Sequence, residues 1–306
     1  MPRATFGPGY EFLARKDLLT YEEIARVARA SARLGVRKIR ITGGEPLLRR
    51  DLPKLISMLS AIPGIEDLAL TTNGVFLAAQ ARALKEAGLG RITVSLDSLD
   101  EDVFKKMNDT DVSVDVVLAG IDAAAAAGLS PVKVNAVVKR GINDHTVVDL
   151  ARRFRGTGHV VRFIEYMDVG RSNGWRLEEV VPAREIAGKI AAVFPLESID
   201  RAYRGEVALR WRYRDGAGEI GLVASVSQPF CGDCTRARLS PEGKIYTCLF
   251  ASAGHDVRGL LRGGASDEHL AAALGGIWAG RSDRYSEIRS AATSGLPRIE
   301  MSYIGG

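Results

Sequence analysis

All three cysteines of the chain lie in one short stretch. Cys231 and Cys234 are two residues apart, and Cys248 follows after thirteen more. Two thiolates at this spacing can bind one metal centre from a tight turn, and a third can join from a neighbouring strand. Because four ligands are usual, the set predicts either a fourth ligand elsewhere or an open metal position where a substrate can bind.

Two alternatives to a catalytic metal centre stay open at this point. Cys231, Cys234 and Cys248 could bind a structural zinc ion with His255 as the fourth ligand, or they could be unconnected core cysteines, which the two-residue spacing disfavours. Arg236 and Arg238 follow the first pair at alternate positions, so on a strand they share one face. Cations beside a metal centre suit an anionic ligand, although a solvated strand face explains them equally well.

Composition limits the classes of protein. The chain has 306 residues, of which 46% are hydrophobic and 26% charged, with a net charge of +5 and a pI near 9.1. A mildly basic chain fits phosphate-bearing partners, but no basic block interleaved with aromatic residues predicts nucleic-acid binding. No apolar run approaches ~20 residues, so we expect no membrane span. Few cysteines, spaced for metal binding, favour a reducing, cytoplasmic location.

Strands and helices must alternate to position these residues. A capping box at Thr20 to Glu23 predicts the first helix, and helices are also expected over about 52 to 61, up to Gly88, from Ser113 to Ala127 and after Asp144. Five strands are predicted between them, at Lys38–Thr42, Leu68–Thr72, Arg91–Ser95, Val132–Val138 and Val160–Tyr166. This alternation predicts parallel βαβ units in an α/β fold, either a barrel or a doubly wound sheet.

Polar residues gather where these strands end. Gly43-Gly44 lets the backbone approach a ligand, and Glu45 can accept a hydrogen bond from an amine or hydroxyl group. The carboxyl ends of parallel strands meet at one edge, where barrels and open sheets place their sites. Arg40 and Lys133, on different strands, could converge with Arg236 and Arg238 on a polyphosphate.

The pattern changes near residue 170. Residues 170–175 resemble a linker, residues 182–193 a helix, and two alternating segments around Asp215-Gly216 a hairpin. The cysteine stretch and a helix at Asp267–Ala279 follow. We therefore expect two domains, at residues 1–170 and 171–306.

A set of motifs extends this interpretation. The set comprises Arg40–Arg49, Leu70–Gly74, Val94–Asp97, Lys133–Asn135, Arg162–Gly170, the cysteines with Thr235–Arg238, and Gly305-Gly306. Together these motifs resemble the GTP 3′,8-cyclase family of radical S-adenosylmethionine enzymes over essentially the whole chain. The family begins molybdenum cofactor (molybdopterin) synthesis. The resemblance implies an incomplete TIM-type (β/α) barrel, with a C-terminal domain that carries an iron–sulfur cluster.

The resemblance also assigns residues and chemistry. It implies an auxiliary [4Fe–4S] cluster on Cys231, Cys234 and Cys248, with its open iron facing GTP. Its implied contacts are Gly44, Ser95 and Met167 for S-adenosylmethionine, Arg40, Thr71, Lys133, Arg236, Ala237 and Arg238 for GTP, and Gly305 and Gly306 as a tail in the active site. An electron cleaves S-adenosylmethionine, and the deoxyadenosyl radical takes the ribose 3′-hydrogen of GTP, giving 3′,8-cyclo-GTP. The family also implies a homodimer; the electron donor is not identified.

The chain departs from the family pattern at one point. A Cys-x3-Cys-x2-Cys motif, which in the family binds the cluster that reduces S-adenosylmethionine, is absent here, and the chain starts at the Met-Pro that follows it in the family. We therefore expect the first barrel strand to be missing, the second [4Fe–4S] cluster to occur only in a longer form, and this form to generate no radical. A start assigned too late explains the loss; the alternative is a GTP-binding or zinc-stabilised protein without catalysis.

Overall fold

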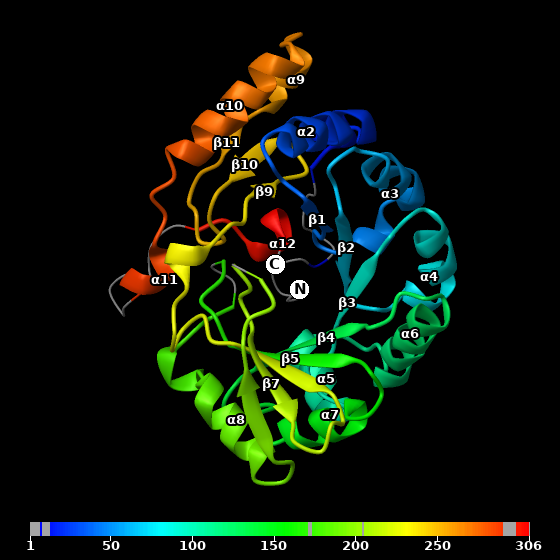
Figure 1. Cartoon of the computed structure of the whole chain (residues 1–306), viewed down its shortest axis with the longest axis vertical. Helices are drawn as coiled ribbons and strands as arrows, with labels where there is room; N and C mark the ends of the chain where they lie inside the picture. Colours follow the sequence, from blue (N-terminus) through cyan, green and yellow to red (C-terminus); the bar gives the residue numbers. More distant parts are fainter. Residues whose placement is uncertain (1–6, 8–12, 171–172, 204, 290–297, 306) are drawn as a thin grey trace.

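The computed structural model describes residues 7, 13–170, 173–203, 205–289 and 298–305 (Figure 1). Its first α-helix starts at the predicted capping box. The Thr20 hydroxyl accepts a hydrogen bond from the Glu23 amide at 3.1 Å, and the Glu23 carboxylate accepts from the Thr20 amide at 2.8 Å. This reciprocal pair satisfies two backbone donors that the helix itself cannot, and helix α2 spans Tyr21–Arg33.

A curved, mostly parallel sheet forms the main body. The five predicted strands are confirmed, with small shifts at their ends, as β1 (Lys38–Ile41), β2 (Asp67–Thr72), β3 (Arg91–Ser95), β4 (Lys133–Val138) and β5 (Val160–Glu165). They pair in parallel in chain order. The predicted α/β class and parallel pairing are therefore confirmed.

Helices cover the outer side of this sheet (Figure 1). The predicted helices occur as α3 (Leu52–Ser60), α4 (Leu77–Glu86), α6 (Val114–Ala126) and α7 (Val147–Phe154). Their aliphatic faces and the outward side chains of the strands form one large buried core. Sequence reasoning missed α5 (Glu101–Asn108), which starts where the Asp100 carboxylate caps the Val103 amide at 2.9 Å. Single-turn 3₁₀ helices occur at Arg15–Asp17, Pro46–Leu48, Leu177–Glu179 and Cys231–Asp233.

The sheet continues past residue 170. Helix α8 (Ala183–Ala191) is followed by β6 (Leu196–Ile199), β7 (Leu209–Tyr213) and β8 (Glu219–Val223). The β7–β8 hairpin was predicted, but β8 also pairs in parallel with β5, giving the order β1-β2-β3-β4-β5-β8-β7-β6. One sheet therefore spans the expected boundary at 170, and the division into residues 1–170 and 171–306 stays a prediction.

The C-terminal part forms a small second layer beside α2. Its elements are β9 (Arg238–Leu239), β10 (Lys244–Tyr246), β11 (His255–Asp256), α9 (Arg258–Arg262), α10 (Asp267–Ala279), α11 (Tyr285–Ile288) and α12 (Met301–Ile304). Helix α10 has the predicted bounds and packs against α2 over a separate apolar cluster that includes Leu19, Val27 and Leu270. Helix α12 lies inside the arc of the main sheet (Figure 1).

The main sheet stays open within the described residues, because β1 and β6 stand at its two ends. It is thus an incomplete barrel whose concave side faces the C-terminal layer (Figure 1). In the same part of the chain, no helix combines the length and the apolar character needed to cross a membrane.

Candidate functional site

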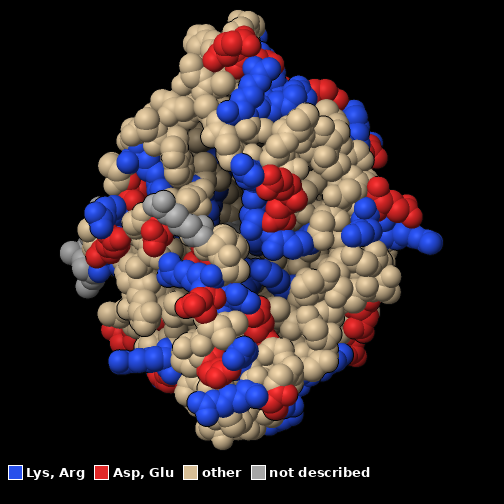
Figure 2. All heavy atoms as spheres, in the orientation of Figure 1, with Lys and Arg blue, Asp and Glu red and all other residues tan. Residues whose placement is uncertain are grey.

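The concave face of the sheet carries cations. Strand register places Arg40, Thr71, Thr93, Lys133 and Arg162 on one face, although they come from five different strands. Nη1 of Arg40 donates to the Thr71 hydroxyl at 3.2 Å, and Nη2 of Arg162 donates to the Thr93 hydroxyl at 3.4 Å. Figure 2 shows a hollow near the centre of the molecule with Lys and Arg atoms along its rim. The predicted convergence of Arg40 with Lys133 therefore has a geometric basis.

These cations lack acidic partners. Within the described residues, no carboxylate lies at ion-pair distance from Arg40, Lys133 or Arg162, whereas their neighbour Arg91 donates to Asp67 at 2.8 Å. Burial and the nearby charges of Arg162, Arg91 and Arg40 lower the pKa of Lys133 to about 8. A group of like charges without an ion-paired acid has the electrostatics that suit a multiply charged anion.

Burial also lowers the pKa of the two arginines. It brings the pKa of Arg162 to about 10, with the charge of Arg40 as a further cause, and it lowers that of Arg40. Arg40 is enclosed by protein atoms yet keeps solvent-accessible surface, as a side chain lining a hollow does. Nε of Arg162 and Oδ1 of Asn135 are buried without hydrogen-bond partners. Such groups are costly unless a ligand or water satisfies them.

The residues assigned to S-adenosylmethionine lie at the carboxyl ends of alternate strands. Gly44 follows β1, Ser95 ends β3, and Met167 follows β5. All three therefore stand at one end of the barrel, while Lys133 starts β4 near the other. The Glu45 carboxylate accepts from the Thr72 hydroxyl at 2.7 Å and from the Asn73 amide at 2.8 Å, so it joins the ends of β1 and β2.

The cysteines approach the barrel from the C-terminal layer. Cys231 and Cys234 flank a 3₁₀ turn, Cys248 follows β10, and all three are half-buried. Burial alone would raise the pKa of Cys234, but the charge and hydrogen bonds of Arg236 lower it overall; Nε and Nη2 of Arg236 lie 3.3 Å from its sulfur. Burial raises the pKa of Cys248, whose sulfur accepts from the Phe250 amide at 3.4 Å.

The donor set can be compared with the needs of a cluster and of zinc. Among the described residues, no three or more His, Cys, Asp or Glu side chains are arranged to hold one metal ion, and His255, the fourth ligand of the zinc alternative, is exposed. A cubane cluster binds its thiolates on separate iron atoms and therefore needs them farther apart than a single ion does. Half-buried thiols with N–H donors and cations around them have the chemistry that such a cluster requires.

Arg238 connects the cysteines with the chain terminus. Its Nε donates to the Gly305 carbonyl at 3.2 Å, and burial together with the charge of Arg236 lowers its pKa to about 10. Gly305 is buried with φ +75°, and a Cβ there would lie 2.3 Å from Cγ2 of Thr42, so the tail reaches the end of β1. Arg236 and Ala237 are exposed and precede β9. Gly306 lies outside the described residues.

A second charged group holds the tail and was missed from the sequence. Asp168, after β5, accepts from Nε of Arg289 at 2.7 Å and from the Tyr285 hydroxyl at 2.6 Å, and it pairs with Arg298 at 3.1 Å. Arg289 also donates to the Ser225 carbonyl at 2.7 Å. The group ties the barrel to the segment that leads into α12.

Arg162 was also not assigned a role from the sequence. A charged residue inside the apolar run Val160–Ile164 was the available signal, because such a residue on a central strand must face a polar interior. Asp168, Arg289 and Arg298 gave no such signal, since they are far apart in the sequence.

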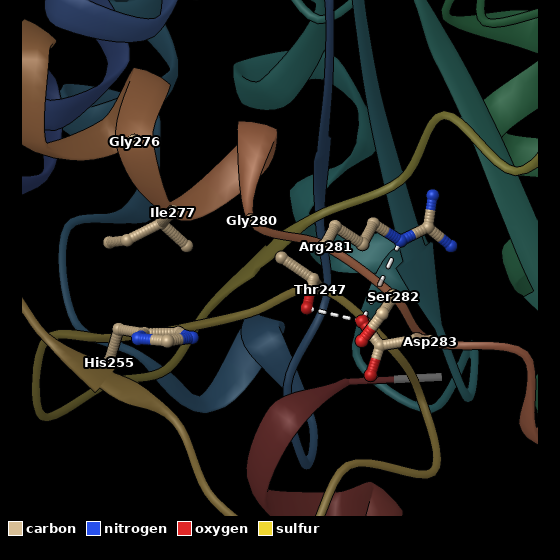
Figure 3. Close-up of a pocket in the computed structure, with 8 residues that line it drawn as sticks. All are labelled: Thr247, His255, Gly276, Ile277, Gly280, Arg281, Ser282 and Asp283. Carbon is tan, nitrogen blue, oxygen red and sulfur yellow. Dashed lines mark hydrogen bonds and ion pairs between the residues drawn. The ribbon is translucent and has the colours of Figure 1, made fainter.

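A cavity of about 380 Å³ lies beside the cysteine region (Figure 3). Its lining contains none of the residues assigned to GTP, S-adenosylmethionine or the cluster; it consists of Thr247, His255, Gly276, Ile277, Gly280, Arg281, Ser282 and Asp283. His255 lies on the opposite side of this cavity from Arg281 (Figure 3).

Comparison with known proteins gives concordant results. Residues 6–154 match the family model described as Radical SAM superfamily, and residues 159–287 match the one described as Molybdenum Cofactor Synthesis C. The chain is 53% identical to a GTP 3′,8-cyclase of Acidothermus cellulolyticus, over 100% of this chain and 91% of that protein. It is 52% and 46% identical to the GTP 3′,8-cyclases of Xanthomonas axonopodis pv. citri and Staphylococcus epidermidis, with the same coverage.

Proposed function

Because this chain belongs to the GTP 3′,8-cyclase family of the radical SAM superfamily, we propose that it binds GTP in the open barrel and acts in molybdenum cofactor biosynthesis. The product of that reaction, (8S)-3′,8-cyclo-7,8-dihydroguanosine 5′-triphosphate, would form only where the cluster that reduces S-adenosylmethionine is also present. The observation that carries the proposal is the group of cations formed by Arg40, Lys133 and Arg162 on the concave face of the sheet, none of which has a carboxylate at ion-pair distance among the described residues.

A triphosphate would offset the repulsion between these cations. Like charges held together in a partly buried site raise the free energy of the folded chain until an anion offsets them. Phosphate oxygens accept several hydrogen bonds at once, and arginine forks bind them in pairs. Nε of Arg162, which is buried without a partner, then gains one. We assign Arg40, Lys133 and Arg162 to the triphosphate and the Thr71 hydroxyl to its orientation.

The cysteine set and its arginines would face the other end of the nucleotide. We assign Cys231, Cys234 and Cys248 to a [4Fe–4S] cluster with one open iron, and Arg236, Ala237 and Arg238 to GTP contacts beside it. Nε and Nη2 of Arg236 lie 3.3 Å from the sulfur of Cys234, and its charge, after burial, is among the causes that lower the pKa of Arg40. These two effects of one side chain support a continuous site. Gly305, held by Arg238 and packed on Thr42, would border the bound nucleotide.

The remaining assignments concern the cofactor. Gly44, Ser95 and Met167 would contact S-adenosylmethionine at the carboxyl ends of β1, β3 and β5. When bound, S-adenosylmethionine and its reducing cluster supply the radical chemistry that the superfamily is named for. The chain's own contribution is to position the ribose of GTP against that chemistry and to hold the triphosphate still.

Nucleotide binding tests the assignment directly. We expect the Lys133→Ala variant to bind GTP on the order of ten- to hundredfold more weakly, as for loss of a charged hydrogen-bond partner. The control is Lys106→Ala, an exposed lysine on α5 outside the barrel. Titration calorimetry under anaerobic conditions measures both. Equal GTP affinities of the wild type and Lys133→Ala would contradict the assignment of the triphosphate to this site.

We also propose that the 306-residue chain alone does not cleave S-adenosylmethionine reductively. Its only three cysteines, Cys231, Cys234 and Cys248, are assigned to the auxiliary cluster, which leaves no thiolates for a second one. On this proposal the chain binds GTP without turnover. Release of 5′-deoxyadenosine in the presence of dithionite, S-adenosylmethionine and GTP would contradict it, whereas GTP binding without release supports it.

A further inference from the structure

A polar bridge joins the two parts of the cysteine set. Arg281 follows α10, and its Nη1 donates to the carbonyl of Cys234. Nε of Arg281 lies at ion-pair distance, 3.7 Å, from Oδ2 of Asp283 without a hydrogen bond, and the same carboxylate oxygen accepts from the Thr247 hydroxyl at 2.5 Å. Figure 3 shows the last two contacts at the edge of the cavity. Since Thr247 directly precedes Cys248, the bridge runs from one cysteine segment to the other.

We propose that Arg281 and Asp283 are positioning residues for the metal centre: they fix the separation of Cys234 from Cys248 and place opposite charges beside the two thiolates. The inference rests on the proposed assignment of Cys231, Cys234 and Cys248 to a [4Fe–4S] cluster. It assigns a role to a segment that contains none of the cluster ligands.

The bridge has the geometry of a support rather than of a surface ion pair. The Arg281 side chain is only 13% exposed and that of Asp283 28%. The guanidinium of Arg281 lies 5.0 Å from the centre of the Trp278 ring, which holds it from the side of α10. A planar guanidinium can meet a carbonyl and a carboxylate at once, which the point charge of a lysine cannot. Groups held in this way around a metal centre orient its ligands.

The two charges of the bridge lie beside different cysteines. The Arg281 guanidinium donates to the carbonyl of Cys234. The Asp283 carboxylate accepts from the hydroxyl of Thr247, the residue directly before Cys248. A cation stabilises the reduced, more negative state of a cluster, and an anion destabilises it. Arg281 therefore raises the reduction potential of the centre and Asp283 lowers it.

Iron retention tests the positioning role. The full chain, wild type and variant, is reconstituted anaerobically with iron and sulfide, and iron is counted before a chelator is added. We expect about four irons in the wild type. We expect Arg281→Gln and Thr247→Val to lose them to the chelator on the order of tenfold faster, the scale at which outer groups affect metal sites. The matched control is Arg140→Gln, which breaks the 2.7 Å ion pair with Glu185 far from the cysteines.

Reduction potential separates this role from a general loss of packing. In variants that keep their iron, Arg281→Gln shifts the potential of the cluster to more negative values and Asp283→Asn to more positive ones, as followed by electron paramagnetic resonance during redox titration. Arg281→Lys, which keeps the charge but not the fork, retains the potential while losing iron faster. A packing defect would shift both potentials in the same direction or leave both unchanged.

The outcomes distinguish the two levels of proposal. A wild-type chain that holds no iron would overturn the cluster assignment itself. If the wild type holds about four irons, the cluster assignment stands. The role of the bridge is then overturned if the variants Arg281→Gln, Asp283→Asn and Thr247→Val match the wild type in both the rate of iron loss and the reduction potential.

Discussion

Two groups of arginines in this molecule differ in their counter-charges. Around Asp168, the side chains of Arg289 and Arg298 are 4% and 3% exposed, and their charges meet a carboxylate, a tyrosine hydroxyl and backbone carbonyls. On the concave face of the sheet, Arg40 and Arg162 share their space with Lys133 and no paired acid among the described residues. The first group has a carboxylate of the chain at ion-pair distance; for the second we assign that role to a bound anion.

The comparison shows that counter-charge, rather than residue type, separates a structural arginine from a binding one. A buried ion pair that loses one partner leaves an uncompensated charge. Removing a charge from the Asp168 group should therefore destabilise the folded chain. Cations without partners lower stability in the free chain and are retained only for what they bind.

The largest effect is expected from Asp168→Ala. Removing the carboxylate leaves Arg289 and Arg298 buried without an anion, which costs about 3 to 5 kcal/mol. The free energy of unfolding in urea, at matched iron content, measures this loss. Asp149→Ala, at an exposed pair with Arg152, is the control and should change stability by less than about 1 kcal/mol. If Asp168→Ala lowered the free energy of unfolding no more than the control does, the two groups of arginines would not differ as described.

Substitution in the cation group should stabilise the free chain and weaken GTP binding. Replacing Arg162 by Met removes a buried charge with an unsatisfied Nε, so we expect the free chain to be stabilised by about 1 kcal/mol or more. GTP affinity should fall on the order of tenfold or more, because a charged donor to phosphate is lost. Thermal unfolding with and without GTP measures both effects. If Arg162→Met lowers the stability of the free chain, Arg162 belongs with the structural arginines.

A smaller effect is expected where the sheet makes room for Arg162. A Cβ at Gly221, on β8, would lie 2.9 Å from Cγ of Arg162 and 3.3 Å from Cβ of Ala208. Since the Arg162 side chain can shift, Gly221→Ala should weaken GTP binding severalfold with little change in stability. Gly188→Ala on α8, where a Cβ has open space, is the control and should bind GTP normally. An unchanged affinity in Gly221→Ala would indicate that the position of Arg162 is not critical.

A change of pH should also distinguish the cation group. Burial and three neighbouring arginines hold the pKa of folded Lys133 at about 8, below its unfolded value near 10.4. Between these values the unfolded chain carries more protons, so this lysine makes stability rise with pH from about 8 to about 10. GTP affinity should fall over the same range as the ammonium is lost. A Lys133→Arg variant should lack both changes when urea unfolding and GTP titration are repeated across this range.

Much of the fold could be predicted from the sequence because its signals are local. Alternating apolar runs, the Thr20 capping box and turn glycines gave the first five strands and most helices with small errors at their ends. Helix α5 was missed because it is short, its eight residues are mostly charged or polar, and Phe104 is its one buried residue. The pairing of β8 with β5 was missed because contacts between distant segments leave no local pattern.

The candidate site divides in the same way. The sequence alone determined the cysteine spacing, the family, and therefore which residues to examine, including the tail at Gly305. Only the tertiary structure decided which charges have partners. Arg40, Lys133 and Arg162 meet because parallel strands with a fixed register present alternate residues on one face, and Asp168 meets Arg298 because the tail folds back onto the barrel. Charge compensation depends on distances in space, and a sequence records only distances along the chain.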